Sequence, residues 1–188
     1  MRILGIMGSP RIEGNTDILL DEALKGAHSR GADVEKIIVD RLNIAPCREY
    51  YGCYEDGSCV IRDAMDDIYV SLSSADAVIV ASPMFFYGLT SQLKALIDRC
   101  QAIWARRYVL HKETAIATRN GAFIAVGATR GEKLFDGSIL TVKYFFKTID
   151  INYTHELLIR GVDKKGEIRE QPQALADAYE LGRRLANR

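Results

Sequence analysis

The sequence lacks the features that mark membrane, secreted and nucleic-acid-binding proteins. No apolar run approaches the roughly 20 residues of a membrane span, and Arg2 is followed at once by apolar residues rather than by a signal peptide. The 25 basic and 25 acidic residues cancel, and no basic block stands out. Nucleic-acid and membrane binding therefore have no electrostatic support, and we expect a cytoplasmic protein.

Cysteine is also scarce, since four cysteines among 188 residues do not suggest a secreted disulfide scaffold. Hydrophobic residues make up 48% and charged residues 27%, which is an ordinary globular composition. Linkers, repeats and low-complexity tracts are missing as well. We expect one domain over residues 1–188, with a cysteine-bearing insertion at about residues 42–60.

What the chain does contain is a regular alternation of apolar strands and amphipathic helices. The continuous apolar run at 77–81 indicates a central strand, whereas the charged residues within 34–39 indicate an edge strand. Further strands are expected near 3–7, 123–126 and 151–159, and helices at 15–31, 63–74, 89–104, 135–149 and 172–185. Five strands alternating with five helices predict an α/β fold, a doubly wound parallel sheet with helices on both faces.

The loop after the first strand has the composition of an anion site. Gly8 and Gly14 flank it, and a helix capped by Asn15 or Thr16 is expected to follow. Free N–H groups and the positive end of the helix dipole would then point at one spot. Ser9, Asn15 and Thr16 can add donors there, and Arg11 adds a cationic fork suited to phosphate.

Three known phosphate patterns do not match this loop. The P-loop spacing fails because five residues separate Gly8 from Gly14 and Asn15 stands where lysine is needed. The dinucleotide pattern G-x-G-x-x-G fails as well, and the loop carries no cysteine nucleophile of the phosphatase type. A terminal monophosphate that is held but not cleaved remains, beside the alternative of an ordinary strand–turn–helix.

Loops after the first, third and fourth strands should meet at the carboxyl edge of the sheet. The second of these, from Ser82 to Gly88, is rich in large apolar side chains and suits a flat ring. The third, Gly127 to Gly131, contributes Thr129 as a candidate ligand. Together the loops predict a ligand with a phosphate at one end and a ring at the other. The alternative is that Phe85 or Phe86 is buried against a neighbouring element.

These residues resemble a known family. The loop from Gly8 to Thr16 and the segment from Ser82 to Arg99 look like the flavodoxin-like NAD(P)H-dependent FMN reductases, with the iron–sulfur flavoproteins as the nearest branch. The resemblance implies a sheet order of 2-1-3-4-5 and FMN as cofactor. It places the FMN phosphate at Ser9, Arg11, Asn15 and Thr16, and the isoalloxazine ring against Pro83, Met84, Phe85, Tyr87 and Gly88.

The same resemblance implies an activity. The chain would be an oxidoreductase that passes electrons from NAD(P)H through FMN to a quinone, flavin, metal complex or protein, and it would form a homodimer or homotetramer. No catalytic side chain is expected, because the flavin carries the chemistry. Arg11, Arg130 and Lys133 are the basic residues expected near the mouth, where a nicotinamide cofactor's phosphates would lie. The alternatives are an FMN electron carrier without a nicotinamide site and a non-redox binding module.

Cysteines are where the sequence departs from the iron–sulfur branch. Proteins of that branch typically carry Pro-Cys-x2-Cys-x2-Cys with a fourth cysteine a few residues on. Here Pro46-Cys47 starts the pattern and Cys53 and Cys59 follow at similar spacing, but Tyr50 stands at the second ligand position. A four-iron cluster normally takes four thiolates, so we assign no metal site. A three-thiolate cluster, a disulfide, a zinc site and free thiols stay open. Cys100 is expected to be a buried small hydrophobe.

Overall fold

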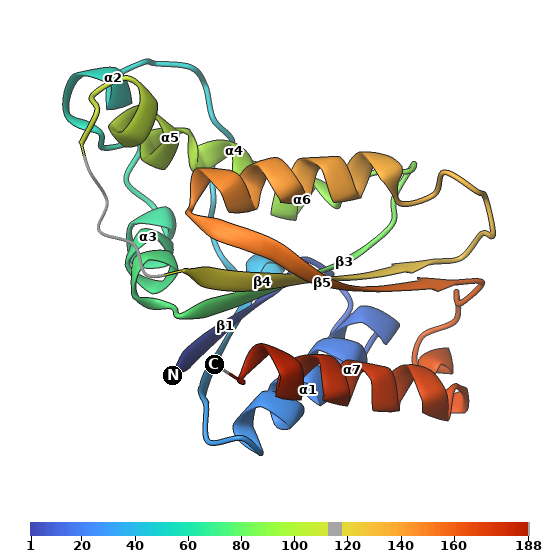
Figure 1. The fold of residues 1–188 in the computed structure, drawn as a ribbon. Coiled ribbons are helices and arrows are strands. Elements are labelled where there is room, and N and C mark those ends of the chain that lie inside the picture. Colours follow the sequence, from blue (N-terminus) through green and yellow to red (C-terminus); the bar gives the residue numbers. More distant parts are fainter. Residues whose placement is uncertain (113–117, 188) are drawn as a thin grey trace.

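The computed structural model describes residues 1–112 and 118–187, within which five parallel strands form one sheet (Figure 1). Their order is β2-β1-β3-β4-β5, which confirms the expected flavodoxin-like arrangement with a central β3 and an edge β2. The strands are β1 (Arg2–Met7), β2 (Asp33–Ile38), β3 (Ala77–Pro83), β4 (Arg119–Gly127) and β5 (Ile151–Arg160). Strand order reverses between β1 and β3, so their carboxyl ends open a crevice.

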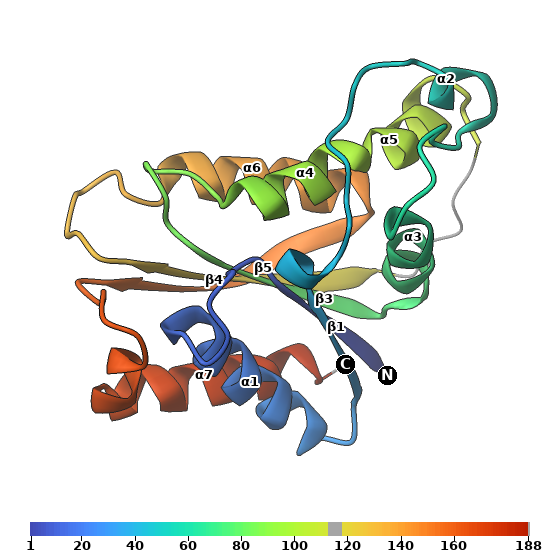
Figure 2. The ribbon, with the colours of Figure 1, turned by 180° about the vertical axis from the view of Figure 1, so that it is seen from behind.

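Helices cover both faces of the sheet (Figure 2). One face carries α1 (Asn15–His28) and α7 (Pro172–Leu185), and the other carries α3 (Met65–Ser74), α4 (Ser91–Arg99) and α6 (Asp136–Thr148). Short 3-10 turns follow β2 and β5, namely η1 (Val39–Arg41) and η2 (Glu167–Glu170). Among the described residues, no helix combines the length and apolar character that crossing a membrane requires.

The side-chain alternation of β3 divides the core into two halves. Val78 and Val80 face the α3–α4–α6 side, whereas Ile79 packs with α1 and α7. Helices α1 and α7 approach each other almost backbone to backbone at Gly26 and Gly182. A Cβ at either glycine would lie about 2 Å from a carbonyl oxygen of the other helix. This packing fixes α1, and with it the loop that precedes α1.

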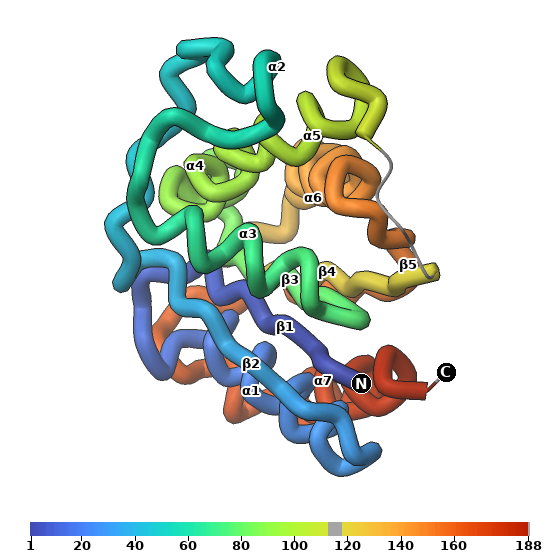
Figure 3. Tube along the Cα trace, turned by 90° about the vertical axis from the view of Figure 1, so that its left-hand side faces the viewer, coloured from blue at the N-terminus to red at the C-terminus, as the bar shows by residue number. Residues whose placement is uncertain are grey.

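The cysteine-bearing insertion crosses from one end of the sheet to the other. It leaves β2 at the carboxyl edge, passes α4, and forms α2 (Cys53–Asp56) beside α5 (Gln101–Tyr108). Figures 1 and 3 show α2 and α5 at the end of the molecule where β1 begins. The strands run away from that end, so the cysteines lie far from the loops at the carboxyl edge.

Two local expectations were wrong. The apolar stripe at 89–104 predicted one helix, but the helix stops at Arg99 and α5 starts anew at Gln101, because Cys100 leaves helical geometry with ψ near 1°. The stripe continues through the break, so periodicity could not reveal it. The first helix is capped by Gly14 rather than by Asn15 or Thr16, with no side-chain capping bond, and it ends at His28.

Candidate functional site

The first and second loops meet in one pocket at the carboxyl edge of the sheet. This pocket, here called the edge pocket, is lined by Ser9, Arg11, Gly14, Asn15, Thr16, Pro83, Met84, Phe85, Val126, Ala128, Val162, Asp163 and Lys165. Tyr87, Gly88 and Thr129 are not among its lining residues. It encloses about 100 Å³, whereas pockets that enclose a whole ligand usually exceed roughly 300 Å³. The enclosed part therefore suits one end of a ligand, and the rest would lie outside.

The first loop leaves donors free at the start of α1. The Ser9 hydroxyl oxygen accepts from the Arg11 N–H at 3.1 Å, which leaves the Ser9 O–H free to donate. Because Gly14 makes no side-chain cap, the first-turn N–H groups of α1 are not used by a capping side chain. A Cβ at Gly8 would lie 2.7 Å from Leu93 Cδ2 and 3.0 Å from the Ala81 carbonyl oxygen, so a larger residue there would force these neighbours to shift.

Thr90 joins this first loop to the second. Its hydroxyl donates to the Gly8 carbonyl at 2.6 Å and also accepts from the Leu93 N–H at 3.3 Å, so it caps α4. Sequence reasoning missed Thr90, although a threonine three residues before a helical leucine is a recognisable capping pattern. The bond to Gly8 O fixes the spacing between the two loops.

The second loop ends in a two-residue turn. Phe85 and Gly88 exchange two backbone hydrogen bonds of 3.0 Å, with Phe86 and Tyr87 at its tip at φ values of 49° and 61°. Met84 N–H donates to Val126 O. Among the described residues, only the N–H groups of Phe86 and Tyr87 remain free to meet a ligand in this turn. Such positive φ values favour glycine or asparagine, so the turn is strained.

The aromatic side chains of this turn face outward. Phe85 is 48% exposed and Phe86 is completely exposed, so the expectation that one of them is buried against another element was wrong. Tyr87 lies against the β4–α6 loop. Its hydroxyl is so close to Gly131 that a Cβ added to this glycine would be only 2.3 Å from the hydroxyl oxygen. The turn thus offers an open apolar surface beside the edge pocket.

The loop between β5 and η2 completes the edge pocket, and sequence reasoning missed it. Asn15 fastens this loop: its amide nitrogen donates to Lys164 O at 2.9 Å, and its amide oxygen accepts from Ile168 N at 3.1 Å. The loop brings Asp163 and Lys165 into the pocket lining. Its position after a parallel strand was the only sequence signal, since ligands sit at those strand ends.

The β4–α6 loop carries the basic residues Arg130 and Lys133, and neither lines the edge pocket. The Arg130 guanidinium rests on Gly161, at whose position a Cβ would be 2.7 Å from Nη2. Arg160 donates to the Gly131 carbonyl and stacks over Phe135, 4.7 Å from the ring centre. Lys133, three residues after Arg130 in the sequence, has an exposed side chain. This loop is thereby anchored to β5.

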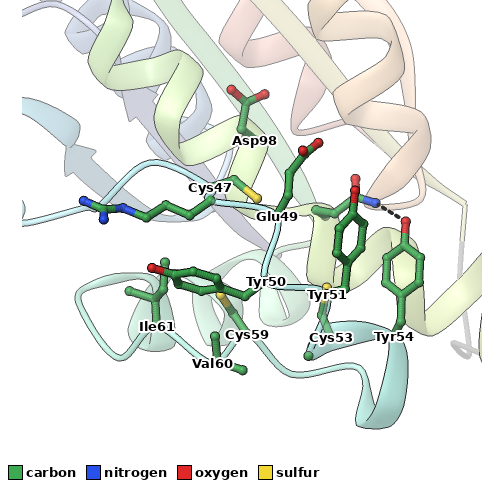
Figure 4. Close-up of a pocket in the computed structure, with 13 residues that line it drawn as sticks. Cys47, Glu49, Tyr50, Tyr51, Cys53, Tyr54, Cys59, Val60, Ile61 and Asp98 are labelled. Atoms are coloured by element: carbon green, nitrogen blue, oxygen red, sulfur yellow. Dashed lines mark hydrogen bonds between the residues drawn. The ribbon is translucent and has the colours of Figure 1, made fainter.

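The three insertion cysteines line a different and larger cavity of about 580 Å³. Figure 4 shows Cys47, Cys53 and Cys59 around it together with Tyr50 and Tyr51. All three thiols are free and partly buried. Burial and the neighbouring Cys59 raise the pKa of Cys53, so its thiol stays protonated at neutral pH.

The residues of this cavity do not fit a four-thiolate cluster. Tyr50 occupies the second ligand position, and the remaining cysteine, Cys100, is 1% exposed in the core, as expected. Burial raises the pKa of Cys100 to about 12. Within residues 1–112 and 118–187, no three histidine, cysteine or acidic side chains converge to hold a metal ion.

Comparisons with known proteins bear on the family and the fold of this chain. The family model described as NADPH-dependent FMN reductase matches residues 1–144. An iron-sulfur flavoprotein of Methanosarcina thermophila is 37% identical over 130 residues, which cover 69% of this chain and 65% of that protein. The chain therefore spans less than two thirds of that relative's length.

Two solved structures share the fold. The NAD(P)H:quinone oxidoreductase from Methanothermobacter marburgensis superposes with a TM-score of 0.72 at 16% identity, covering 98% of both chains. An FMN-dependent NADH-azoreductase from Bacillus anthracis, solved in complex with FMN, gives a TM-score of 0.70 at 15% identity and covers both chains completely.

Proposed function

The chain belongs to the NADPH-dependent FMN reductase family, and from that premise we propose that it binds FMN at the edge pocket and transfers electrons from NAD(P)H to a second acceptor. The acceptor would be a quinone, a free flavin, a metal complex or a protein. Bound FMN supplies the hydride and electron chemistry, while the chain binds and orients it. The observation that carries the proposal is that the first loop and the Pro83–Gly88 turn meet at one pocket.

In this proposal the enclosed part of the pocket holds the phosphate. The hydroxyls of Ser9 and Thr16 and the first-turn N–H groups of α1 donate to it, and Arg11 supplies a positive charge. Thr16 is only 2% exposed, so a ligand contact there would exclude water. A buried charge-assisted contact contributes more than an exposed one.

The ring end lies on the open side of the pocket. Pro83, Met84 and Phe85 line the side next to it, and the turn with Tyr87 and Gly88 extends the apolar surface. An exposed ring face leaves room for a nicotinamide to approach and for the acceptor to replace it. Arg130 and Lys133 flank that approach, where nicotinamide phosphates would lie.

We also propose a cytoplasmic homodimer or homotetramer. The support for an assembly is the complete exposure of Phe86 at the tip of the turn, together with Leu140 and Tyr144, which are 58% and 64% exposed on α6. Large apolar side chains left in water are typical of surfaces that a partner covers.

The proposal is tested by replacing the phosphate contacts. Arg11→Ala and Thr16→Ala should each weaken FMN binding by about 1–3 kcal/mol, because each removes one contact to a charged group. Flavin fluorescence titration measures the dissociation constants, and circular dichroism checks that the variants fold. Arg62→Ala is the matched control, since Arg62 is 70% exposed just after the insertion and, among the described residues, forms an ion pair with Asp66 alone.

Two results would contradict the phosphate assignment. One is an unchanged FMN dissociation constant in both variants. The other is wild-type protein that binds riboflavin as tightly as FMN.

A further inference from the structure

We propose that Lys165, on the loop between β5 and η2, determines the preference of this site for a terminal phosphate monoester, and that Asn15 is a positioning residue that holds this loop in place. The inference rests on the proposed binding of FMN at the edge pocket. It assigns a role to a loop outside the first two, and it changes the role expected of Asn15.

The first support is a pair of positively charged side chains, which outnumber the one carboxylate of the pocket lining. Arg11 and Lys165 both line the pocket, and among the described residues neither side chain has an ion-pair partner. Among the described residues, Lys25, Lys36 and Lys94 form ion pairs with carboxylates. Lys165 differs from the other lysines without an ion pair in that it lines the edge pocket. A phosphate monoester carries close to two negative charges at neutral pH, so the two cations together match it.

Asp163 lines the same pocket and carries the opposite sign. A carboxylate only accepts hydrogen bonds, so it cannot contact a phosphate dianion favourably. It suits hydroxyl donors such as those of a ribityl chain. The loop therefore presents a cation for the phosphate and an acceptor for the sugar alcohol next to it.

The second support is how firmly the loop is held. Both polar atoms of the Asn15 amide are used, by Lys164 O and by Ile168 N–H. The Glu167 carboxylate accepts from the N–H groups of Asp163 and Lys164 at 2.8 Å, and these hydrogen bonds lower the pKa of Glu167. A loop fixed from both sides presents Lys165 at a smaller entropic cost on binding.

These bonds give the Asn15 side chain a role in holding the loop. They use its amide oxygen and one of its two amide N–H groups. Asn15 therefore acts on the ligand through the loop it holds, which predicts energetic coupling between Asn15 and Lys165.

Ligand selection follows from the charge pair. Riboflavin has no phosphate and gains nothing from Lys165. FAD carries a single charge on each phosphate and continues into a nucleotide, so it matches two cations at one end less well. Lys165 should thus contribute to FMN binding and not to riboflavin binding.

The experiment compares Lys165→Ala with Lys164→Ala in the full chain, because Lys164 is also exposed but does not line the pocket. Lys165→Ala should weaken FMN binding roughly ten-fold and leave riboflavin binding unchanged. The salt dependence of FMN binding should also become shallower. Lys164→Ala should change FMN binding by less than about two-fold.

A double-mutant cycle tests the role of Asn15. In an Asn15→Ala background, Lys165→Ala should cost clearly less than it does in the wild type. Equal effects of the two lysine variants, equal weakening of riboflavin, or strict additivity in the cycle would overturn the inference while FMN binding itself stands. Wild-type protein that takes up no FMN would overturn the proposed function and this inference together.

Discussion

Asp63 and Arg99 form the most completely buried ion pair among the described residues, with side chains 5% and 0% exposed and atoms 2.6 Å apart. Arg99 also donates to the carbonyls of Ala45 and Ile61, so one side chain on α4 holds both ends of the insertion. Burial alone would raise the pKa of Asp63, but hydrogen bonds from Arg99 and from two backbone N–H groups lower it overall. The pair therefore anchors to α4 both ends of the insertion that carries the cysteines.

Asp63→Asn should destabilise the fold by about 3–5 kcal/mol, because it leaves the Arg99 charge buried without a partner. Denaturant unfolding measures the change. The Asp63 pKa is depressed in the folded state, so its contribution is present above the unfolded value of about 3.9 and is lost as pH falls through the folded value. Asp66→Asn, which breaks only an exposed pair, should cost about 0–1 kcal/mol. Equal stability of the two variants would show that the buried pair does not hold the insertion.

The turn between β3 and α4 combines strain with exposure. Two bulky residues, Phe86 and Tyr87, occupy left-handed positions that a two-residue turn usually gives to asparagine and glycine. Phe86 is fully exposed and so receives no packing energy in return. Strain that the fold does not compensate is characteristic of functional segments.

Phe86→Asn should raise the free energy of unfolding by about 1 kcal/mol, because asparagine tolerates this conformation. For a chain of this length that corresponds to a melting temperature higher by about 2–4 °C. The same variant should lower the rate of flavin turnover, since the apolar tip is lost. Melting and steady-state assays measure the two effects. Lower stability together with unchanged turnover would contradict the functional reading of the turn.

Elements were predictable where hydrophobic periodicity was strong. The run at 77–81 identified the central strand, and Pro172 identified the start of the last helix. The break at Cys100 was not predictable, because the apolar stripe continues through it. Gly14 was overlooked as the cap, although glycine is among the residues that favour that position. Asn15 looked like a cap in sequence, but its amide bonds a loop about 150 residues away.

At the scale of the whole molecule, the location of the edge pocket followed mainly from the expected parallel topology. Once strands alternate with helices, the loops after β1 and β3 must meet at one edge, and they do. The place of Lys165 in the pocket lining could not be anticipated, because residues 161–170 have the composition of an ordinary polar turn. Thr129 was expected in the pocket and does not line it. The cysteine cavity shares no lining residue with the edge pocket, so the two are separate features of one chain.

The central claim is that this chain binds FMN and lets a nicotinamide reduce it. The most direct measurement is the visible absorption of the purified protein, mixed with FMN under anaerobic conditions and then with NADPH or NADH. We predict that the flavin band bleaches faster than that of free FMN and returns when a quinone is added. A protein that takes up FMN but leaves its band unchanged with both nicotinamides would contradict the reductase account, and a protein that takes up none would contradict the site as well.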